Sequence, residues 1–240
     1  MNPPEVTRVS MLSLSPCTVV AAHPHDPQAF TQGLCWVDDA LFESTGLTGC
    51  STVRRVRLED GAVLQSSRVP DDLFGEGLTA WGDELLSLTY QGGRGFRWDR
   101  RTLALRGEFA FDGEGWGLTN DGTRLIMSNG TPRLSYLDPV TLAPACSLVV
   151  TAGGRPLPWI NELQYVAGEI WANVLTLPAI ARIDPVTGVV RGWIDLGPIV
   201  AEAAAGDREK VANGIAHDPQ SGRLFVTGKN WSRLYEIQLG

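Results

Sequence analysis

A short pattern that occurs five times along the chain is the feature that most constrains its fold. Each copy begins with a polar or aromatic residue followed by Gly-Leu or a close variant, then runs through an apolar stretch, a turn and a second apolar stretch. The copies begin at Gln32-Gly33-Leu34, Glu76-Gly77-Leu78, Trp116-Gly117-Leu118, Asn161-Glu162-Leu163 and Asn213-Gly214-Ile215. Strand-like copies spaced at about 40 to 52 residues are typical of the blades of a β-propeller.

A second pair of strand-like segments follows each of the first four copies. The two segments flank turn signals such as Asp60-Gly61, Asp138-Pro139 and Asp184-Pro185, which are favourable in tight hairpins. Each copy therefore predicts four antiparallel strands, which together make one blade.

The two ends of the chain are complementary in this scheme. The fifth copy stops after its third strand, at residues 233–239, whereas residues 17–22 form a strand before the first copy. We expect the N-terminal strand to complete the last blade and close the ring, because closure removes an exposed strand edge. The prediction is an all-β, five-bladed β-propeller of four-stranded antiparallel blades. It is a single domain over residues 1–240, with a short alanine-rich helix inserted near residues 198–211.

The composition limits the classes of partner. With 43% hydrophobic and 20% charged residues the chain is globular, and it has no apolar run of 18 residues that would span a bilayer. Its net charge of −7 argues against binding to nucleic acid or to an anionic membrane surface. Small molecules, peptides or proteins remain as partners, and we expect a monomer.

The cysteines and the N-terminal segment say little about function. Cys17, Cys35, Cys50 and Cys146 form no CxxC pair, which favours buried free thiols over a zinc ribbon or a redox dithiol. The apolar stretch from Met11 to Ala22 is broken by serines and a proline and follows a single basic residue, so we interpret it as structural and not as a signal peptide. The sequence leaves the cellular compartment open.

The first residue of the repeated motif is the position that does not repeat. Equivalent positions in a propeller lie at equal depth around the axis, so this position predicts a ring of Gln32, Glu76, Trp116, Asn161 and Asn213. One carboxylate, one indole and three amides suit a pocket for a small polar ligand. Polar residues at the start of a blade also satisfy backbone groups, and on these residues alone both explanations stand.

Alternate residues of the innermost strands add candidates that face the channel or its rim. They are Glu43, Trp171, Asn173 and Lys229. Lys229 directly follows a strand, where an ordinary solvated lysine is the common alternative. Phe30 and Tyr90 fit either the core or the walls of a pocket.

Metal and nucleophile chemistry have less support. His23 and His25 would share a strand face, as metal ligands can, but no third ligand is evident. The His-Asp-Pro-Gln string of His25 recurs at His217, which indicates a repeated turn. The sequence contains no G-x-S-x-G nucleophile elbow and no glycine-rich phosphate loop. We therefore predict no metal site and no cofactor.

Several strings resemble the plant and bacterial glutaminyl cyclotransferases and cover residues 23–239 in order. They are HDPQAFTQGL (25–34), FESTGL (42–47), FGEGLT (74–79), GWGL (115–118), NEL (161–163), EIWAN (169–173), NGIA (213–216) and FVTGK (225–229). The resemblance implies a five-bladed propeller, in agreement with the blade count. It also implies a metal-independent enzyme that converts N-terminal glutaminyl residues of peptides to pyroglutamyl residues with loss of ammonia.

The resemblance also implies roles for individual residues. Glu76 matches the acid/base carboxylate, which would carry a proton from the attacking α-amine to the leaving nitrogen. Lys229 and Asn161 match positions whose donors would hold the oxyanion or the carbonyl groups of the substrate. Trp116 and Trp171 match aromatic walls of the site.

Further residues complete the predicted substrate-binding set. Gln32, Glu43, Glu162 and Asn213 match orienting or supporting groups, and Phe30 and Tyr90 join them as pocket walls. Tyr90 stands where the family pattern has a tryptophan, so it keeps an aromatic wall but adds a hydroxyl.

Two other functions remain open at this point. One is a catalytically silent propeller that binds peptides or glycans, a common use of the fold. The other is a metal-dependent lactonase-type propeller, which would need several ligands converging on the axis, whereas the predicted ring holds one carboxylate.

Overall fold

The computed structural model describes residues 13–240, and regular structure in this range is almost entirely β-strand. The first residues of the predicted domain and of the apolar stretch that starts at Met11 lie outside the described residues. No helix within residues 13–240 is long and apolar enough to cross a membrane.

Four-stranded antiparallel sheets follow the first three copies of the repeat. The first contains β2 (Thr31–Val37), β3 (Ala40–Thr45), β4 (Thr52–Val56) and β5 (Val63–Arg68). The second contains β6 (Gly75–Trp81), β7 (Glu84–Thr89), β8 (Arg94–Asp99) and β9 (Leu105–Ala110). The third contains β10 (Leu118–Asn120), β11 (Leu125–Met127), β12 (Arg133–Leu137) and β13 (Pro144–Val149). Consecutive strands are neighbours in each sheet, as the hairpin signals predict.

The last two copies share an eight-stranded sheet with β1 (Leu14–Pro24), in the order β16-β17-β18-β19-β1-β22-β21-β20. Its other strands are β16 (Ile160–Val166), β17 (Glu169–Val174), β18 (Ala179–Ile183), β19 (Val190–Asp195), β20 (Ala212–His217), β21 (Leu224–Gly228) and β22 (Arg233–Leu239). The N-terminal strand β1 pairs antiparallel with the last strand, from Cys17 opposite Leu239 to Pro24 opposite Arg233. A short parallel pairing joins Leu14–Pro16 to Trp193–Asp195 of β19.

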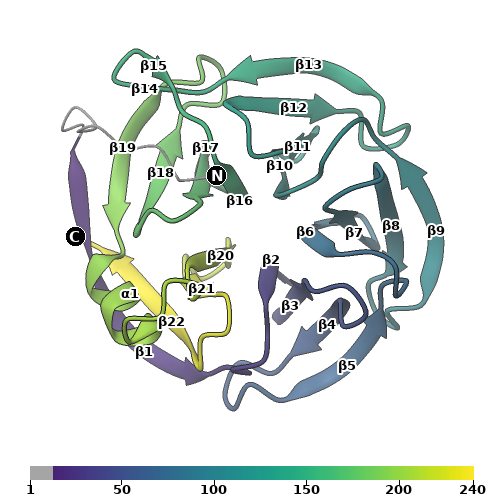
Figure 1. The fold of residues 1–240 in the computed structure, drawn as a ribbon, viewed down its shortest axis with the longest axis horizontal. Helices are drawn as coiled ribbons and strands as arrows, with labels where there is room; N and C mark the ends of the chain where they lie inside the picture. The colour runs from purple at the N-terminus through teal and green to yellow at the C-terminus, as the bar shows by residue number, and fades with distance from the viewer. Residues whose placement is uncertain (1–12) are drawn as a thin grey trace.

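The sheets surround a common centre, with the first strand of each repeat innermost (Figure 1). β2, β6, β10, β16 and β20 lie nearest the centre, and β5, β9, β13, β19 and β1 lie at the periphery. Every residue of β3, β7 and β17 except Glu84 is buried, whereas β5 and β9 expose alternate residues. Side chains on the inner strands are therefore surrounded by protein on both faces.

The predicted helical insertion is present but shorter than expected. The helix α1 spans Gly197–Ala204, with a proline in its first turn, and so it does not reach residue 211. Ala205 adopts a left-handed conformation with φ of 48°, and Gly206 follows with φ of 87°. These two residues end the helix, because a left-handed residue cannot continue the hydrogen-bond ladder.

A small hairpin precedes the fourth repeat. It pairs β14 (Thr151–Ala152) with β15 (Arg155–Pro156). Gly153 and Gly154 form its turn, both at positive φ, where glycine carries no steric penalty.

Apolar side chains from neighbouring sheets pack together to form the core. Phe42 and Val53 of the first sheet, for example, share one cluster with Leu85, Phe96 and Trp98 of the second. Burying each such side chain contributes about 1.5 to 3 kcal/mol. Contacts between sheets, and not within one sheet alone, therefore hold the inner strands in place.

The outer hairpins confirm the turn chemistry predicted from the sequence. The carboxylates of Asp60, Asp99, Asp138 and Asp184 each accept a hydrogen bond from a backbone N–H two or three residues later. The two His-Asp-Pro-Gln strings use the same arrangement: Asp26 accepts from Gln28 N and Asp218 from Gln220 N. The recurrence of this string is thus explained by turns.

The glycine of the repeated motif allows the innermost strands to approach closely. A Cβ atom on Gly117 would lie 2.1 Å from the carbonyl oxygen of Asn161, whereas a Cβ on Gly107 of β9 would meet nothing within 4 Å. We expect Gly117→Ala to lower the free energy of unfolding by about 3 kcal/mol, because backbone must move to admit the methyl group. Gly107→Ala is the matched control, with an expected change of about 0.5 kcal/mol or less. Urea denaturation of both variants tests this, and equal midpoints would contradict it.

Candidate active site

A β-bulge at the start of each innermost strand presents the non-repeating residue. In β2, β6, β16 and β20 the pairing register shifts by one residue at the motif, around Gln32, Glu76, Asn161 and Asn213. At the third repeat, Trp116 N–H donates to Ser128 O and Ser128 N–H donates to Gly117 O, so two residues again oppose one. Bulges re-aim side chains, and the same local device recurs at the non-repeating residue of each copy.

Glu76 and Lys229 are both buried, and the charge of each acts on the pKa of the other. Their exposed fractions are 5% and 8%. Burial raises the pKa of Glu76 well above its ordinary value, with the positive charge of Lys229 opposing this shift and Glu114 adding to it. Burial also lowers the pKa of Lys229, against the charges of Glu76 and Glu209. The two shifts bring the pKa values of these groups closer together, which favours proton exchange at this site.

Lys229 is held by the backbone and by an aromatic ring. It follows β21, and its N–H donates to Val211 O at 2.9 Å. Its Nζ lies 4.7 Å from the centre of the Phe30 ring, within range of a cation–π interaction. The predicted alternative of a solvated surface lysine is therefore wrong for this residue.

Trp116 is anchored beside Glu76 through a second carboxylate. Its indole Nε1 donates to Glu114 Oε2 at 3.0 Å. The ring also rests against Gly130, where an added Cβ would lie 2.7 Å from the indole. The carboxylate that fixes Trp116 is thus the same one whose charge acts on Glu76.

Five aromatic side chains follow one another around the site, and we call them the aromatic arc. They are Phe30, Phe74, Tyr90, Trp116 and Trp159. Successive ring centres are 5.9, 6.1, 6.3 and 6.2 Å apart. These are tilted or edge-to-face contacts, the geometries that aromatic pairs prefer. Lys229 stands at the Phe30 end of the arc.

Phe74, Trp159 and Glu114 were missed in the sequence, although a signal for them exists. They stand two residues before the ring residues Glu76, Asn161 and Trp116, as Phe30 stands before Gln32. The structure confirms this equivalence, because the carbonyls at this position accept equivalent backbone hydrogen bonds. Gly46 donates to Phe30, Tyr90 to Phe74, Leu175 to Trp159, and Lys229 to Val211, which stands two residues before Asn213. Alignment two residues upstream of the motif would therefore have revealed the arc.

The three amide side chains of the ring differ in their hydrogen-bond partners. Asn213 Nδ2 donates to Gln32 Oε1 and to Thr31 O, both at 2.9 Å, so these two residues orient each other. Asn161 is 3% exposed, and its Oδ1 has no hydrogen-bond partner among residues 13–240. Its backbone carbonyl accepts from Ser128 Oγ at 2.7 Å, which fixes the backbone beneath the side chain. The Oδ1 of Asn213 also has no partner in this range, so the difference is that Asn213 is held through its Nδ2 whereas Asn161 is held through its backbone.

Glu43, which we predicted to contact substrate, is fully engaged within the fold. It is 0% exposed, and its carboxylate accepts from His25 Nε2 at 3.0 Å, Thr31 Oγ1 at 2.6 Å and Arg54 Nε at 2.8 Å. Arg54 also binds Asp26 at 2.9 Å. Burial would raise the pKa of Glu43, but its cationic and hydroxyl partners lower it to about 2. We therefore assign Glu43 to stability and not to substrate binding.

Glu162, another predicted substrate contact, interacts with the backbone of two other repeats. Its Oε1 accepts from the backbone N–H of Leu34 at 3.4 Å, and the N–H of Ile215 also acts on it. Burial raises its pKa well above the ordinary value, against these two donors. Glu162 therefore links the first, fourth and fifth repeats.

Trp171 and Asn173 of β17 also serve the scaffold. Trp171 is 4% exposed within a core cluster that includes Ile180, Ile194 and Leu196, and its Nε1 donates to Glu169 at 3.3 Å. Asn173 Oδ1 accepts from Gly214 N at 3.0 Å and so supports the bulge that carries Asn213. This placement favours packing over the predicted wall role of Trp171.

The histidine candidates for a metal site have other partners. His25 Nδ1 lies 2.8 Å from Trp231 O and Nε2 lies 3.0 Å from Glu43, so both nitrogens donate and the ring is cationic. Within residues 13–240, no group of three or more His, Cys, Asp or Glu side chains is placed to hold a metal ion. All four cysteines are free, although Cys50 and Cys146 are exposed and not buried as predicted.

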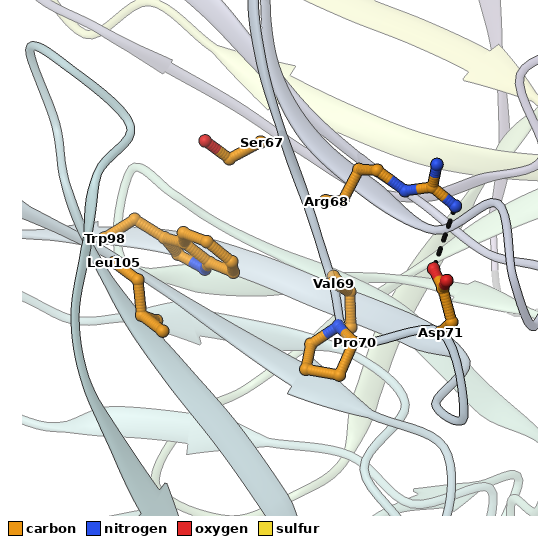
Figure 2. Close-up of a pocket in the computed structure, with 7 residues that line it drawn as sticks. All are labelled: Ser67, Arg68, Val69, Pro70, Asp71, Trp98 and Leu105. Carbon is orange, nitrogen blue, oxygen red and sulfur yellow. Dashed lines mark hydrogen bonds and ion pairs between the residues drawn. The ribbon is translucent and has the colours of Figure 1, made fainter.

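A surface hollow lies apart from this site. It is formed at the periphery between the first two sheets, where Trp98 and Leu105 face Val69 and Pro70 (Figure 2). An ion pair of 2.8 Å between Arg68 and Asp71 borders it. None of the ring residues lines this hollow, so it takes no part in the candidate site.

Comparisons with known proteins agree on one family. A sequence model described as glutamine cyclotransferase matches residues 3–239. The Arabidopsis thaliana glutaminyl-peptide cyclotransferase is 44% identical over 225 residues, which cover 92% of this chain and 70% of that protein.

Solved structures give the same result for the fold. The crystal structure of Myxococcus xanthus glutaminyl cyclase aligns with a TM-score of 0.89 and 35% identity, covering 94% of this chain and 97% of that one. The WD40 β-propeller domain of Doa1 aligns with a TM-score of 0.51 and 9% identity, covering 85% of this chain and 62% of that one. At that identity the second likeness concerns the fold alone.

Proposed function

The chain belongs to the glutamine cyclotransferase family, and we propose that it converts N-terminal glutaminyl residues of peptides to pyroglutamyl residues. In this reaction the α-amine attacks the side-chain amide carbon. A new C–N bond closes the five-membered ring, the original amide C–N bond breaks, and ammonia leaves with a proton that came from the attacking amine. Water is neither consumed nor formed.

The buried pair of Glu76 and Lys229 is the observation that carries the proposal. The reaction needs an uncharged amine, a donor for the tetrahedral oxyanion and a proton carrier between two nitrogens. A carboxyl whose pKa burial raises can accept a proton from the amine and release it to the leaving nitrogen. We assign this transfer to Glu76.

Lys229 and Asn161 supply the polar contacts to the substrate in this scheme. The ammonium of Lys229 stabilises negative charge on the amide oxygen as the tetrahedral intermediate forms. Asn161 Oδ1, which has no partner within residues 13–240, accepts from an N–H of the substrate, such as its α-amine or first peptide group. The pair of Gln32 and Asn213 borders the same ring level and orients the glutaminyl chain.

The aromatic arc provides the apolar side of the pocket. Phe30, Tyr90 and Trp116 exclude water around the carboxyl of Glu76 and favour a folded glutaminyl chain, in which amine and amide carbon are close. Tyr90 lies between Phe74 and Trp116, so it occupies the arc as a tryptophan would. No step requires a metal or a cofactor.

We further propose that the repeats form a closed, five-bladed propeller that acts as a monomer. The pairing of β1 with β22 supports closure, since it supplies the fourth strand that the last repeat lacks. Equivalent bulges in five repeats support the blade count. One subunit then contains a complete site.

Incubation with a peptide that begins with glutamine tests the function. We expect release of one ammonia per peptide and a mass loss of about 17 Da, as cyclisation requires. The same peptide with an acetylated α-amine should give neither, because its nitrogen cannot attack. An inactive enzyme, or ammonia release from the acetylated peptide, would contradict the proposal. In the latter case the reaction would be amide hydrolysis.

A further inference from the structure

Trp159 is a large apolar side chain held in an unfavourable backbone conformation at the open end of the aromatic arc. Its φ is 67°, in the left-handed region that bulky residues rarely adopt, and 43% of its surface is exposed. Neither property helps folding, because glycine would fit this backbone without strain and a polar residue would be better solvated.

The backbone around Trp159 is nevertheless fixed on both sides. Its N–H donates to Gly130 O at 2.7 Å, and its carbonyl accepts from Leu175 N at 2.8 Å. Its ring centre lies 6.2 Å from that of Trp116, at an angle of 43°. The indole is thus held next to Trp116 with one side open to solvent.

The repeat places Trp159 at the same level as Phe30 and Phe74. All three stand two residues before a ring residue, and their carbonyls accept equivalent backbone bonds. Phe30 lies under Lys229 and Trp116 is bonded to Glu114, whereas Trp159 contacts neither of these charged groups in the described structure. Trp159 therefore extends the apolar wall away from the reacting groups.

From this position we propose that Trp159, together with Trp116, binds the side chain of the second residue of the peptide and favours aromatic side chains there. The inference rests on the proposed function. Adjacent residues of an extended peptide are about 3.8 Å apart at their Cα atoms, so a glutaminyl residue beside Trp116 brings its neighbour within reach of the next ring. A tilted indole pair with one open side suits an aromatic side chain better than a charged one.

Kinetics with the dipeptide amides Gln-Phe-NH₂ and Gln-Gly-NH₂ test this assignment. We expect the wild type to prefer Gln-Phe-NH₂ by about 5-fold or more in kcat/KM, the gain of one aromatic contact. In Trp159→Gly the preference should fall to about 2-fold or less, mainly through a higher KM for Gln-Phe-NH₂. Glycine keeps the left-handed backbone, so this variant should fold.

Two further variants separate binding from backbone effects. Trp159→Phe should restore most of the preference, since it returns an aromatic ring. Asp39→Gly, at an exposed residue with φ of 54° in the turn after β2, should leave the preference unchanged. Equal preference in wild type and Trp159→Gly, or no preference in the wild type, would overturn the inference alone. A wild type that cyclises neither substrate would overturn the proposed function and this inference with it.

Discussion

Replacement of Glu76 by glutamine is expected to lower kcat for cyclisation by about 1,000-fold, the scale of one general acid–base group. Glutamine preserves the shape and the polar character of the side chain but cannot accept and return a proton. The loss should therefore appear in kcat, with KM changed little, because ground-state contacts persist. Ammonia release from a glutamine-initiated peptide measures both parameters.

Stability provides the control for this variant. The carboxyl of Glu76 is buried, and burial raises its pKa, so the charged form is disfavoured in the folded protein. The melting temperature should stay close to that of the wild type, because within residues 13–240 the carboxyl of Glu76 is not hydrogen-bonded to a cation as that of Glu43 is. A variant that is inactive and also strongly destabilised would point to a structural role, and an active variant would remove Glu76 from the mechanism.

Replacement of Glu43 by glutamine is expected to lower the free energy of unfolding by about 3 kcal/mol or more, because one partner of a buried ion network is lost. The change would leave the cationic His25 and Arg54 facing a neutral amide in the interior. Asp71→Asn is the matched control, since its partner Arg68 is 67% exposed and such surface pairs contribute about 0 to 1 kcal/mol. Urea denaturation at pH 6 compares them, and equal losses would contradict the prediction.

The same network predicts how stability depends on pH. The pKa of Glu43 falls from 4.5 to about 2 on folding, so its contribution is present above pH 4.5 and is lost as the pH falls toward 2. Burial lowers the pKa of His25, but the charge and hydrogen bond of Glu43 outweigh burial and the net shift is upward from 6.5. Its contribution is therefore complete below pH 6.5 and is lost as the pH rises through the raised value.

These two shifts define a window between pH 4.5 and 6.5 in which the network is complete. Melting temperatures across pH 3 to 9 should be highest in this window for the wild type. In Glu43→Gln the loss of stability above pH 6.5 should disappear, because His25 then loses the charge and hydrogen bond that raise its pKa. An unchanged profile in the variant would show that other groups set the pH dependence.

Much of the scaffold could be predicted from local pattern. Apolar alternation predicts strands, and the aspartates of the hairpin tips act within two or three residues of the chain. The helix end was misplaced because the prediction followed the alanine content and not Gly206, a residue type that commonly ends helices, before which Ala205 is already left-handed.

The candidate site was only partly predictable, because polar residues assigned to the reaction and polar residues that support the fold have the same sequence signature. Glu76 and Glu162 both lie in an innermost motif, and both are buried carboxyls. The charge of Lys229 acts on Glu76, whereas Glu162 receives backbone N–H donors from Leu34 and Ile215. The difference arises from contacts between repeats that lie far apart in the chain.

Local sequence pattern was enough to define the repeat, the strand order and the variable position that carries Glu76 and Asn161, because strands and turns depend mainly on residues close together in the chain. Which polar residues are free to act depends on the folded protein around them. The tertiary structure satisfied Glu43 with His25 and Arg54, buried Trp171 between repeats and left Trp159 exposed beside Trp116. Burial and pairing of a side chain depend on the residues that neighbouring repeats place beside it, and each of the five similar inner strands has different neighbours.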